Sequence, residues 1–357
     1  MSADRAWRPL DGLVVLDLSR MLPGGTATLL LADLGATVHK VEHPSGDDTR
    51  RLRPAIGDDS SAQHQYLDRG KRSHRIDLKT AEGREQVVEL ARSADAVIES
   101  FRPGVADRLG IGYRDLSAVN ERLVYVSLSG YGQDGPRAQF AGHDLNFAAL
   151  ASLAGPTPPR AMHADVAGGM LAALAIAAGS AEARATGRGR QVDVALMDAA
   201  LFTVGMPLSE EFGALALDEP VGTPLDGNSP CYRAYRCADG RYVAVAAIEP
   251  KFWRNVVALL EHPEWESRQD DPALVPELER VFLERSRDEW SRLLDAAETC
   301  VTPVRSSAEL LDDPHLVHRG SLQQRATAAG PLWQVAPPFA VSGAPTPQPT
   351  TREKSHA

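Results

Sequence analysis

The sequence is poor in cysteine, with Cys231, Cys237 and Cys300 the only three in 357 residues. An odd and sparse set argues against a disulfide framework and is typical of a protein from a reducing compartment. The first two lack the CxxC spacing of zinc sites, so small buried side chains are the simplest interpretation and we expect no metal. No apolar segment follows the N-terminal charges, as it would in a signal peptide. We therefore expect a cytoplasmic protein.

Long apolar runs and a positive net charge are also missing. The longest apolar stretch, 168–178, is shorter than the roughly 20 residues of a membrane helix, so we expect no membrane segment. The net charge of −10 disfavours nucleic acid as a partner. One basic cluster could still receive a small polyanion, or could be a solvated surface. Its members are Arg69, Lys71, Arg72, Arg75 and Lys79, with Arg102 and Arg108 further along.

Several common catalytic and nucleotide-binding motifs are absent. The segment Leu22-Pro23-Gly24-Gly25, after the first predicted strand, is too short for the GxGxxG dinucleotide fingerprint. The chain has no GxxxxGK[ST] phosphate loop and no HExxH, and the glycines around Tyr131 do not form the GxSxG nucleophile elbow. Function must therefore come from a less common arrangement of residues.

Short apolar segments alternate with helical segments through the first half of the chain. This alternation predicts the α/β class, with a parallel sheet flanked by helices. The predicted strands are 13–18, 37–42, 73–78, 96–101, 123–129 and 191–196, and the predicted helices are 26–34, 82–93 and 168–185. From about residue 205 the pattern changes to a smaller α+β domain, with a strand at 241–247 and helices at 251–261 and 276–297.

Three polar sites lie in loops next to apolar segments: Gly142-His143-Asp144, Asp165, and Glu249-Pro250. Taken singly, each acid could be a helix cap or a first-turn acid that the helix dipole favours, and the histidine could be an ordinary surface residue. Together they could perform general acid–base chemistry, with His143 and a carboxylate on opposite faces of a substrate. His143-Asp144 also stands at a predicted helix start, where backbone N–H groups can stabilise an enolate oxygen.

Several colinear motifs resemble the superfamily of family III CoA-transferases (CaiB/BaiF) and α-methylacyl-CoA racemases, from about residue 10 to 338. The first motifs are Leu30-Leu-Ala-Asp-Leu-Gly-Ala36, Lys40-Val-Glu-His-Pro44, Gly70-Lys-Arg-Ser73 and Asp77-Leu-Lys79. Later ones are Phe101-Arg-Pro-Gly-Val105, Arg108-Leu-Gly110, Ser129-Gly-Tyr-Gly-Gln-Asp-Gly-Pro136, Gly187-Arg-Gly-Arg-Gln191, Ala238-Asp-Gly-Arg-Tyr242 and Cys300-Val-Thr-Pro-Val304. The resemblance implies an enzyme acting on acyl-CoA thioesters.

The resemblance leaves two chemistries open at Asp165. Transferases of this kind use the matching aspartate as a nucleophile, which forms an acyl anhydride and passes CoA to another acid. Racemases place an acid–base aspartate there. A Gly-His-Asp motif and a Glu-Pro pair mark the racemases, and this chain has both, at His143 and Glu249. We therefore expect a racemase of 2-methylacyl-CoA, in which His143, assisted by Glu249, and Asp165 serve opposite faces of the α-carbon while Asp144 supports them.

The resemblance also implies a CoA site, with CoA part of the substrate and no prosthetic group. The matching positions are His43, Ile76, Asp77, Leu78, Lys79, Ser100, Phe101, Arg102, Arg108, Gly142, Leu145, Asn146 and Phe147. His43 stands where relatives often have arginine, so Lys40 or Lys71 could compensate as a phosphate partner.

Family members fold as a Rossmann-like large domain and a small domain, in an interlocked homodimer. Here the large domain would comprise 1–200, followed by a linker at 201–224, a small domain at 225–310, a return segment at 311–342 and a disordered tail at 343–357. Glu249 would then complete the partner's active site. The alternatives to a racemase are a CoA-transferase using Asp165 and an acyl-CoA-binding protein without catalysis.

Overall fold

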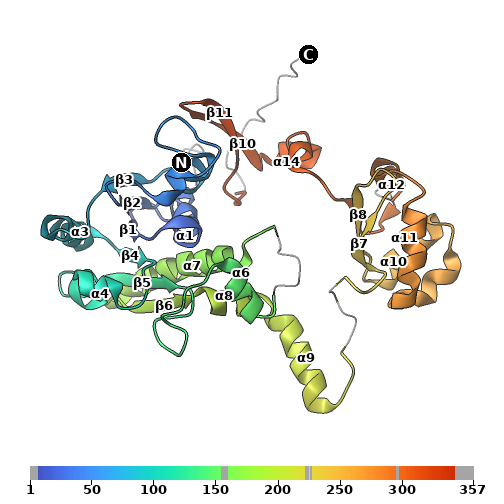
Figure 1. The fold of residues 1–357 in the computed structure, drawn as a ribbon, viewed down its shortest axis with the longest axis horizontal. Helices are drawn as coiled ribbons and strands as arrows, with labels where there is room; N and C mark the ends of the chain where they lie inside the picture. Colours follow the sequence, from blue (N-terminus) through green and yellow to red (C-terminus); the bar gives the residue numbers. More distant parts are fainter. Residues whose placement is uncertain (1–6, 154–159, 222–224, 226, 295–296, 342–357) are drawn as a thin grey trace. The chain divides into compact units, whose positions relative to one another are not determined.

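The chain divides into two units, each with its own core. A computed structural model describes residues 7–153, 160–221, 225, 227–294 and 297–341. One unit comprises Met1–Met206 with His315–Ala357, and the other comprises Pro207–Pro314 (Figure 1). The predicted tail at 343–357 lies outside the described residues.

A six-stranded sheet organises the first unit, with the order β3-β2-β1-β4-β5-β6 and every neighbouring pair parallel. The strands are β1 (Val14–Leu18), β2 (Thr37–Glu42), β3 (Arg72–Arg75), β4 (Ala96–Glu99), β5 (Val124–Ser129) and β6 (Gln191–Ala195). This is the strand order of doubly wound dinucleotide-binding folds, in which ligands bind at the carboxyl ends of the strands where the order reverses. The predicted α/β class is confirmed, and the reversal lies between β1 and β4.

Helices cover both faces of this sheet (Figure 1). They are α1 (Met21–Asp33), α2 (Ala62–Leu67), α3 (Ala81–Ser93), α4 (Val105–Leu109), α5 (Tyr113–Ser117), α6 (Asp144–Leu150), α7 (His163–Thr186) and α8 (Leu196–Thr203). Successive strand residues alternate between the faces: Val15 and Ile98 pack with α1 and α7, and Leu16 and Val97 pack with α3. Because both of their faces are buried, the central strands β1, β4 and β5 are mostly apolar, as the sequence pattern predicted, whereas the edge strand β3 is polar and mostly exposed.

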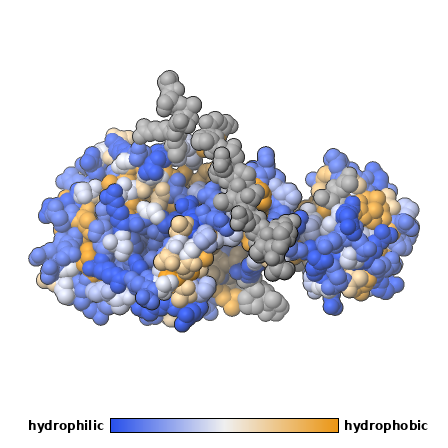
Figure 2. All heavy atoms as spheres, turned by 90° about the horizontal axis from the view of Figure 1, so that it is seen from above, coloured by the Kyte–Doolittle hydropathy of each residue, from blue (hydrophilic) through white to orange (hydrophobic). Residues whose placement is uncertain are grey.

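The prediction that no segment could span a membrane needs correction. Helix α7 is 24 residues long and, by length and composition alone, apolar enough to cross one. It packs against α1, α8 and β5, and it buries Ala172, Ala173 and Ile176 in the sheet core. A core helix of a globular protein passes the same test, and these contacts account for the buried apolar residues of α7, whereas Met170 and Leu174 on the same helix are exposed. The face of the molecule in Figure 2 is mostly hydrophilic, with apolar residues in separate patches.

A cluster of buried charges holds the carboxyl end of β1. Asp17 is fully buried, and its Oδ1 accepts hydrogen bonds from the backbone and hydroxyl of Ser19. Lys40 Nζ lies 3.2 Å from Asp17 Oδ1, and Lys71 Nζ lies 3.6 Å from Oδ2 and 2.8 Å from Asp68. Burial acts to raise the pKa of Asp17, but the two ammonium groups, together with the hydrogen bonds from Ser19 and Thr28, outweigh it and lower that pKa. The cluster fixes the turn that joins β1 to α1.

The second unit is built on an antiparallel sheet of order β7-β8-β9. Its strands are β7 (Tyr232–Arg236), β8 (Tyr242–Ala246) and β9 (Val301–Pro303), and its helices are α9 (Gly205–Leu217, which begins in the first unit), α10 (Pro250–Leu259), α11 (Val275–Phe282), α12 (Arg287–Leu294) and α13 (Ser307–Leu310). The short helix α14 (Pro314–Arg319) and the hairpin of β10 (Leu322–Thr327) and β11 (Gly330–Val335) follow. The mixed α and β content of this unit matches the prediction.

Several predicted elements differ from the structure, and helices α1 and α7 each begin five residues earlier than predicted. Strand β3 ends at Arg75, because Asp77 and Thr80 form the turn that starts α3. The predicted helix 276–297 is two helices, since Ser286 bonds Glu289 and begins α12. The predicted linker 201–224 is helical over much of its length, in the end of α8 and in α9.

Candidate active site

His143 stands at the start of α6, on a support of aromatic side chains. It is the N-cap residue, and its backbone N–H donates to Asn146 Oδ1 at 3.0 Å. The preceding Gly142 lies so close to the rings that an added Cβ would be 2.7 Å from both Phe147 and the Tyr131 hydroxyl. Those two rings pack edge to face at 5.0 Å. Only glycine fits at position 142, and this packing sets the direction in which the chain enters α6.

Asp165 lies in the first turn of α7, beside the start of α6. The sequence placed it just before the long helix, but α7 begins at His163, five residues earlier than predicted. The backbone N–H of Asp165 donates to Asp144 Oδ1 at 3.0 Å, so the first residue of α6 is bonded to the first turn of α7. Two residues that are 21 positions apart in the chain thus meet at two helix starts.

The pKa of Asp165 shows that His143 belongs to the same cluster. Burial raises the pKa of Asp165 to about 6, the negative charge of Asp144 acts in the same direction, and the charge of His143 opposes them. His143 is therefore close enough to act electrostatically on Asp165. A carboxyl group with a pKa near neutrality can both accept and donate a proton under physiological conditions, which general acid–base catalysis requires.

Two glycines behind Asp165 let α7 approach its neighbours. A Cβ on Gly168 would lie 2.3 Å from Leu196 Cδ2, and one on Gly169 would lie 2.5 Å from the Pro23 carbonyl oxygen. Helix α7 therefore packs directly against α1 and α8. The Gly-Gly pair that the sequence placed after Asp165 has a packing role, because it fixes the helix that carries the carboxylate.

We expect Gly142→Ala to lower kcat for the reaction proposed below by about 10²-fold, because a displacement near 1 Å can cost that much. The added methyl group would have to move Tyr131 or Phe147, or the loop that carries His143. Steady-state kinetics and a thermal melt would check this. Gly25→Ala, in α1, is the matched control, since a Cβ there would meet Leu67 at 3.4 Å, an ordinary van der Waals distance. Wild-type kcat in a folded Gly142→Ala variant would contradict the assigned role.

A second site is a pocket of about 530 Å³ at the carboxyl ends of β1, β2 and β4, next to the point of strand reversal. A volume in this range suits a nucleotide-sized ligand. Six of its lining residues were predicted from the sequence. They are Ile76, Asp77, Leu78, Lys79 and Phe101, with His43. The other lining residues are Leu18, Arg20, Val41, Glu42, Ser45, Gly46, Asp47, Val105 and Leu109.

Arg20 is a pocket residue that the sequence analysis missed. It lies two residues after the end of β1, and its position beyond the carboxyl end of a central parallel strand is the signal that could have identified it. Arg50 does not add free charge here, because it makes two 2.6 Å hydrogen bonds to Glu42. Burial acts to raise the pKa of Glu42, but the hydrogen bonds from Arg50 and Ser73 outweigh it and lower the pKa to about 2.

Other predicted ligand residues do not line this pocket in the described part of the chain. Ser100 accepts a hydrogen bond from the backbone of Arg20, and Arg102 lines a separate small cavity. Arg108 is on α4, where Val105 and Leu109 face the pocket instead. Near His143, Phe147 is 3% exposed and faces the core, so its side chain supports the site from beneath.

The remaining predicted positions on α6 stay predictions. Gly142, Leu145 and Asn146 belong to the His143 segment and not to the 530 Å³ pocket. Leu145 is 44% exposed and therefore accessible. Glu249 is exposed at the N-cap of α10, in the second unit, so it belongs to a different part of the chain from Asp165.

Lys40 and Lys71 do not compensate for His43. Both are buried in the ion pairs with Asp17 described above, and Arg69 is likewise paired with Asp33 at 2.5 Å. Two members of the predicted basic cluster, Arg69 and Lys71, are thus internal to the fold, whereas the other five are exposed. The cations that line the pocket are Arg20 and Lys79, beside His43, whose Nδ1 lies 2.7 Å from Ser45 Oγ.

Comparison with known proteins identifies the fold and the family. The profile of CoA-transferase family III matches residues 10–353. The chain belongs to CoA-transferase family III. Human alpha-methylacyl-CoA racemase is 34% identical over 327 residues, which cover 87% of this chain and 82% of that protein. Human succinyl-CoA:glutarate CoA-transferase is 29% identical over 345 residues, with 89% and 76% covered.

Solved structures agree with this assignment to family III. A CaiB/BaiF family protein from Brucella suis has a TM-score of 0.81 at 30% identity, covering 95% of this chain and 94% of the other. Rv3272 from Mycobacterium tuberculosis has a TM-score of 0.80 at 28% identity, with 94% of each chain covered. Since the family contains both racemases and transferases, membership establishes enzyme chemistry on CoA esters in general and leaves the individual reaction open.

Proposed function

We propose that the protein is a racemase that exchanges the α-proton of a 2-methylacyl-CoA thioester. The supporting observation is the cluster of His143, Asp144 and Asp165, in which burial raises the pKa of one carboxyl group to about 6 beside a histidine. Proton exchange at carbon needs an acid and a base that can swap roles, and the cluster supplies both.

The proposed reaction passes through an enolate. One of His143 and Asp165 removes the proton from the α-carbon, and the electron pair of the C–H bond moves onto the thioester oxygen. The other residue then returns a proton to the opposite face, so atoms and charge balance over the cycle. Asp144 holds the backbone of Asp165 in place, and its own N–H, at the first position of α6, would face the enolate oxygen.

Coenzyme A is part of the substrate in this proposal, and no prosthetic group takes part. The nucleotide portion would occupy the 530 Å³ pocket, with its phosphates near Arg20, His43 and Lys79. Arginine and lysine suit phosphate groups, and the apolar side chains of Ile76 and Phe101 suit the adenine ring.

A homodimer would bring Glu249 to the partner's His143. Exposed apolar side chains on α8 and α9 support an interface between copies, because Phe202, Met206 and Leu215 are at least 75% exposed. Sedimentation equilibrium should then give twice the 38.4 kDa chain mass. A monomer that is fully active would contradict the shared site.

The proposed reaction can be tested with a panel of acyl-CoA thioesters in deuterium oxide. Mass spectrometry should show uptake of one deuterium at the α-carbon of branched substrates. A second carboxylic acid is added to each reaction, because formation of its CoA ester would reveal a transferase instead. A chain that binds CoA esters but does neither would be a binding protein without catalysis.

A CoA-transferase is the second candidate, and the position of Asp165 supports it. Transferases among the relatives, such as succinyl-CoA:glutarate CoA-transferase, share the fold and align along most of the chain. In that reaction the Asp165 carboxylate attacks the thioester carbonyl, CoA leaves as the thiolate, and an acyl anhydride remains. Hydroxylamine would trap this anhydride as a hydroxamate, and a trapped acyl group on Asp165 would replace the racemase proposal.

We expect kcat/KM for exchange to fall about tenfold per pH unit below about pH 6, for both epimers of the substrate. In either direction the active form carries one proton on the His143–Asp165 pair. At low pH a second proton binds to Asp165, whose pKa is raised to about 6, and the doubly protonated pair has no base left to remove the α-proton. The acid limb should be the same in both directions, because the two productive forms carry the same number of protons. Initial rates between pH 4.5 and 8 measure it, and limbs that differ between epimers would contradict the two-residue scheme.

A further inference from the structure

Glu99 is a buried carboxyl group that the proposed reaction does not use. It ends β4 at 3% exposure. Its Oε2 accepts a 2.7 Å hydrogen bond from the backbone N–H of Phe101, and a hydrogen bond from Ser127, its neighbour on β5, also stabilises its charged form. Phe101 lines the 530 Å³ pocket. Glu99 therefore holds the backbone of a residue whose ring faces the proposed ligand.

The residue between them makes a second connection to the pocket rim. Ser100 Oγ accepts a 2.9 Å hydrogen bond from the backbone N–H of Arg20, which also lines the pocket. This bond joins the ends of β1 and β4, on the two sides of the strand reversal. Glu99 thus fixes a short segment that places Phe101 directly and braces Arg20 through Ser100.

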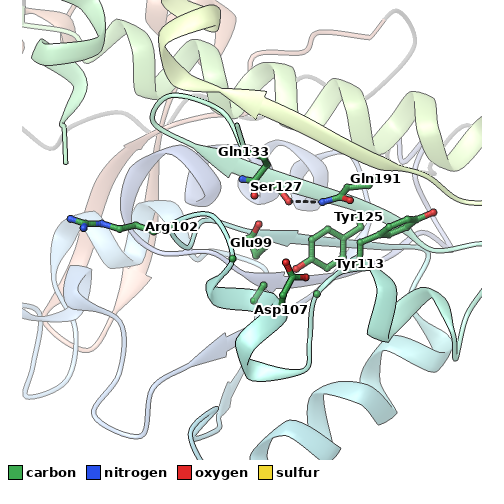
Figure 3. Close-up of a pocket in the computed structure, with 11 residues that line it drawn as sticks. Glu99, Arg102, Asp107, Tyr113, Tyr125, Ser127, Gln133 and Gln191 are labelled. Atoms are coloured by element: carbon green, nitrogen blue, oxygen red, sulfur yellow. Dashed lines mark hydrogen bonds between the residues drawn. The ribbon is translucent and has the colours of Figure 1, made fainter. Parts of the chain in front are cut away.

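The space around Glu99 excludes a direct role in chemistry. The cavity that it lines holds about 20 Å³, room for one water molecule and far too little for a thioester. Figure 3 shows Glu99 and Asp107 facing into this cavity beside Ser127, with Arg102 extending away from it. Glu99 can act on a substrate only through the segment that it holds.

We propose that Glu99 is a positioning residue, which sets the affinity of the pocket for the CoA portion of the substrate by holding the 100–102 segment. This inference rests on the proposed binding of CoA esters in that pocket. It adds a function for a residue outside both the pocket lining and the His143 cluster.

The charges around Glu99 indicate that its geometry matters more than its charge. Burial raises the pKa of Glu99 to about 7, and Asp107 and Asp193 act in the same direction. A protonated form is therefore well populated at neutral pH. That form keeps a carbonyl oxygen that can accept from Phe101, as the amide of glutamine would.

Three substitutions separate the effect of side-chain length at position 99 from the effect of its charge. Glu99→Gln keeps the length and an acceptor oxygen but removes the charge, whereas Glu99→Asp keeps the charge but withdraws the oxygen by one methylene group. Glu99→Ala removes both. An unsatisfied N–H costs enough to change an equilibrium by about tenfold or more. We expect Glu99→Asp and Glu99→Ala to weaken binding about tenfold, and Glu99→Gln to bind within about threefold of wild type.

The measurement is isothermal titration calorimetry of the full chain with coenzyme A itself, followed by exchange kinetics. KM for the acyl-CoA should rise in the two weakened variants while kcat stays within about threefold, because the His143 cluster is untouched. Glu89→Gln, an exposed acid on α3, is the matched control. A thermal melt confirms that each variant is folded.

The outcomes distinguish failure of the positioning role from failure of the proposed CoA binding. If wild type binds coenzyme A and a folded Glu99→Asp binds it equally well, the positioning role is wrong. An equal loss in Glu99→Gln and Glu99→Asp would show that an acceptor oxygen at the reach of glutamate does not preserve binding, and would also overturn it. If Glu99→Ala does not fold, the comparison of Gln with Asp still decides. Failure of wild type to bind coenzyme A would instead reject the proposed function of the pocket.

Discussion

Asp165→Asn should lower the rate of α-proton exchange by about 10³-fold, because an amide can neither accept nor donate the proton that the reaction moves. The substitution is nearly isosteric, so the hydrogen bond from the Asp165 backbone to Asp144 should survive. Deuterium uptake from solvent, followed by mass spectrometry, measures the loss. Exchange at more than a tenth of the wild-type rate would remove Asp165 from the mechanism.

The same substitution should stabilise the fold at pH 7. The pKa of Asp165 is raised to about 6 in the folded chain, against a reference value of 3.8, so the folded state holds this proton more tightly than the unfolded state. Stability is therefore lost as the pH rises from about 4 to about 6, and the penalty is complete above that range. Discounted for partial exposure, it amounts to about 1–2 kcal/mol.

Urea unfolding at two pH values checks this stabilisation. Asp165→Asn should unfold at a higher urea concentration than wild type at pH 7, and at nearly the same concentration at pH 3.5. Glu182→Gln, on the exposed far end of α7, is the control and should change neither activity nor midpoint. A lower midpoint for Asp165→Asn at pH 7 would show that the carboxylate is stabilising, contrary to its environment.

Asp17→Ala should cost about 3–5 kcal/mol of unfolding free energy, because it leaves buried ammonium groups without their shared partner. Lys40 and Lys71 are at most 3% exposed at their side chains, and both lie within 4 Å of the Asp17 carboxylate. The Ser19 and Thr28 hydroxyls lose their acceptor as well. Urea or thermal unfolding of the purified variant measures the loss.

Two measurements test whether the loss of stability in Asp17→Ala comes from the unpaired charges. Adding Lys40→Met to Asp17→Ala should recover part of the stability, because it removes one uncompensated charge. The pKa of Asp17 is lowered, so its contribution is present above about pH 4 and is lost as the pH falls through its folded value. The difference between Asp17→Ala and wild type should therefore be constant from pH 5 to 9. A loss below about 1 kcal/mol would mean that the buried pair is dispensable.

The sequence predicted the central strands of the sheet well because they are buried on both faces. Strand β2 has the predicted bounds, Thr37–Glu42, and β1, β4, β5 and β6 each differ by one or two residues. Buried parallel strands are continuous apolar runs between turn signals, and both features can be recognised directly in a sequence. The one predicted strand that extended well beyond its end, 73–78, ran into a turn formed by side-chain hydrogen bonds.

The sequence indicated which residues form the candidate site, but not the packing contacts that support them. His143 and Asp165 lie at helix starts and could be found by residue type and resemblance. Their meeting depends on Gly142 and Gly169, where a missing Cβ permits contacts closer than 3 Å. Such contacts join segments far apart in the chain and leave no periodic pattern. The expectation that Lys40 or Lys71 could bind phosphate was wrong for a related reason, since the sequence does not distinguish a buried lysine from a surface lysine.

The close approach of Gly169 to Pro23 links the two regions that the proposed reaction assigns to different ends of one substrate. Pro23 follows Arg20 in the turn that opens α1, and Gly169 stands about one helical turn after Asp165 in α7. The carbonyl of one helix would touch any side chain placed on the other. The distance between the 530 Å³ pocket and the His143–Asp165 cluster is therefore set by backbone packing. Under the proposed function, only a ligand whose reactive carbon lies at the matching distance from its phosphates could reach both.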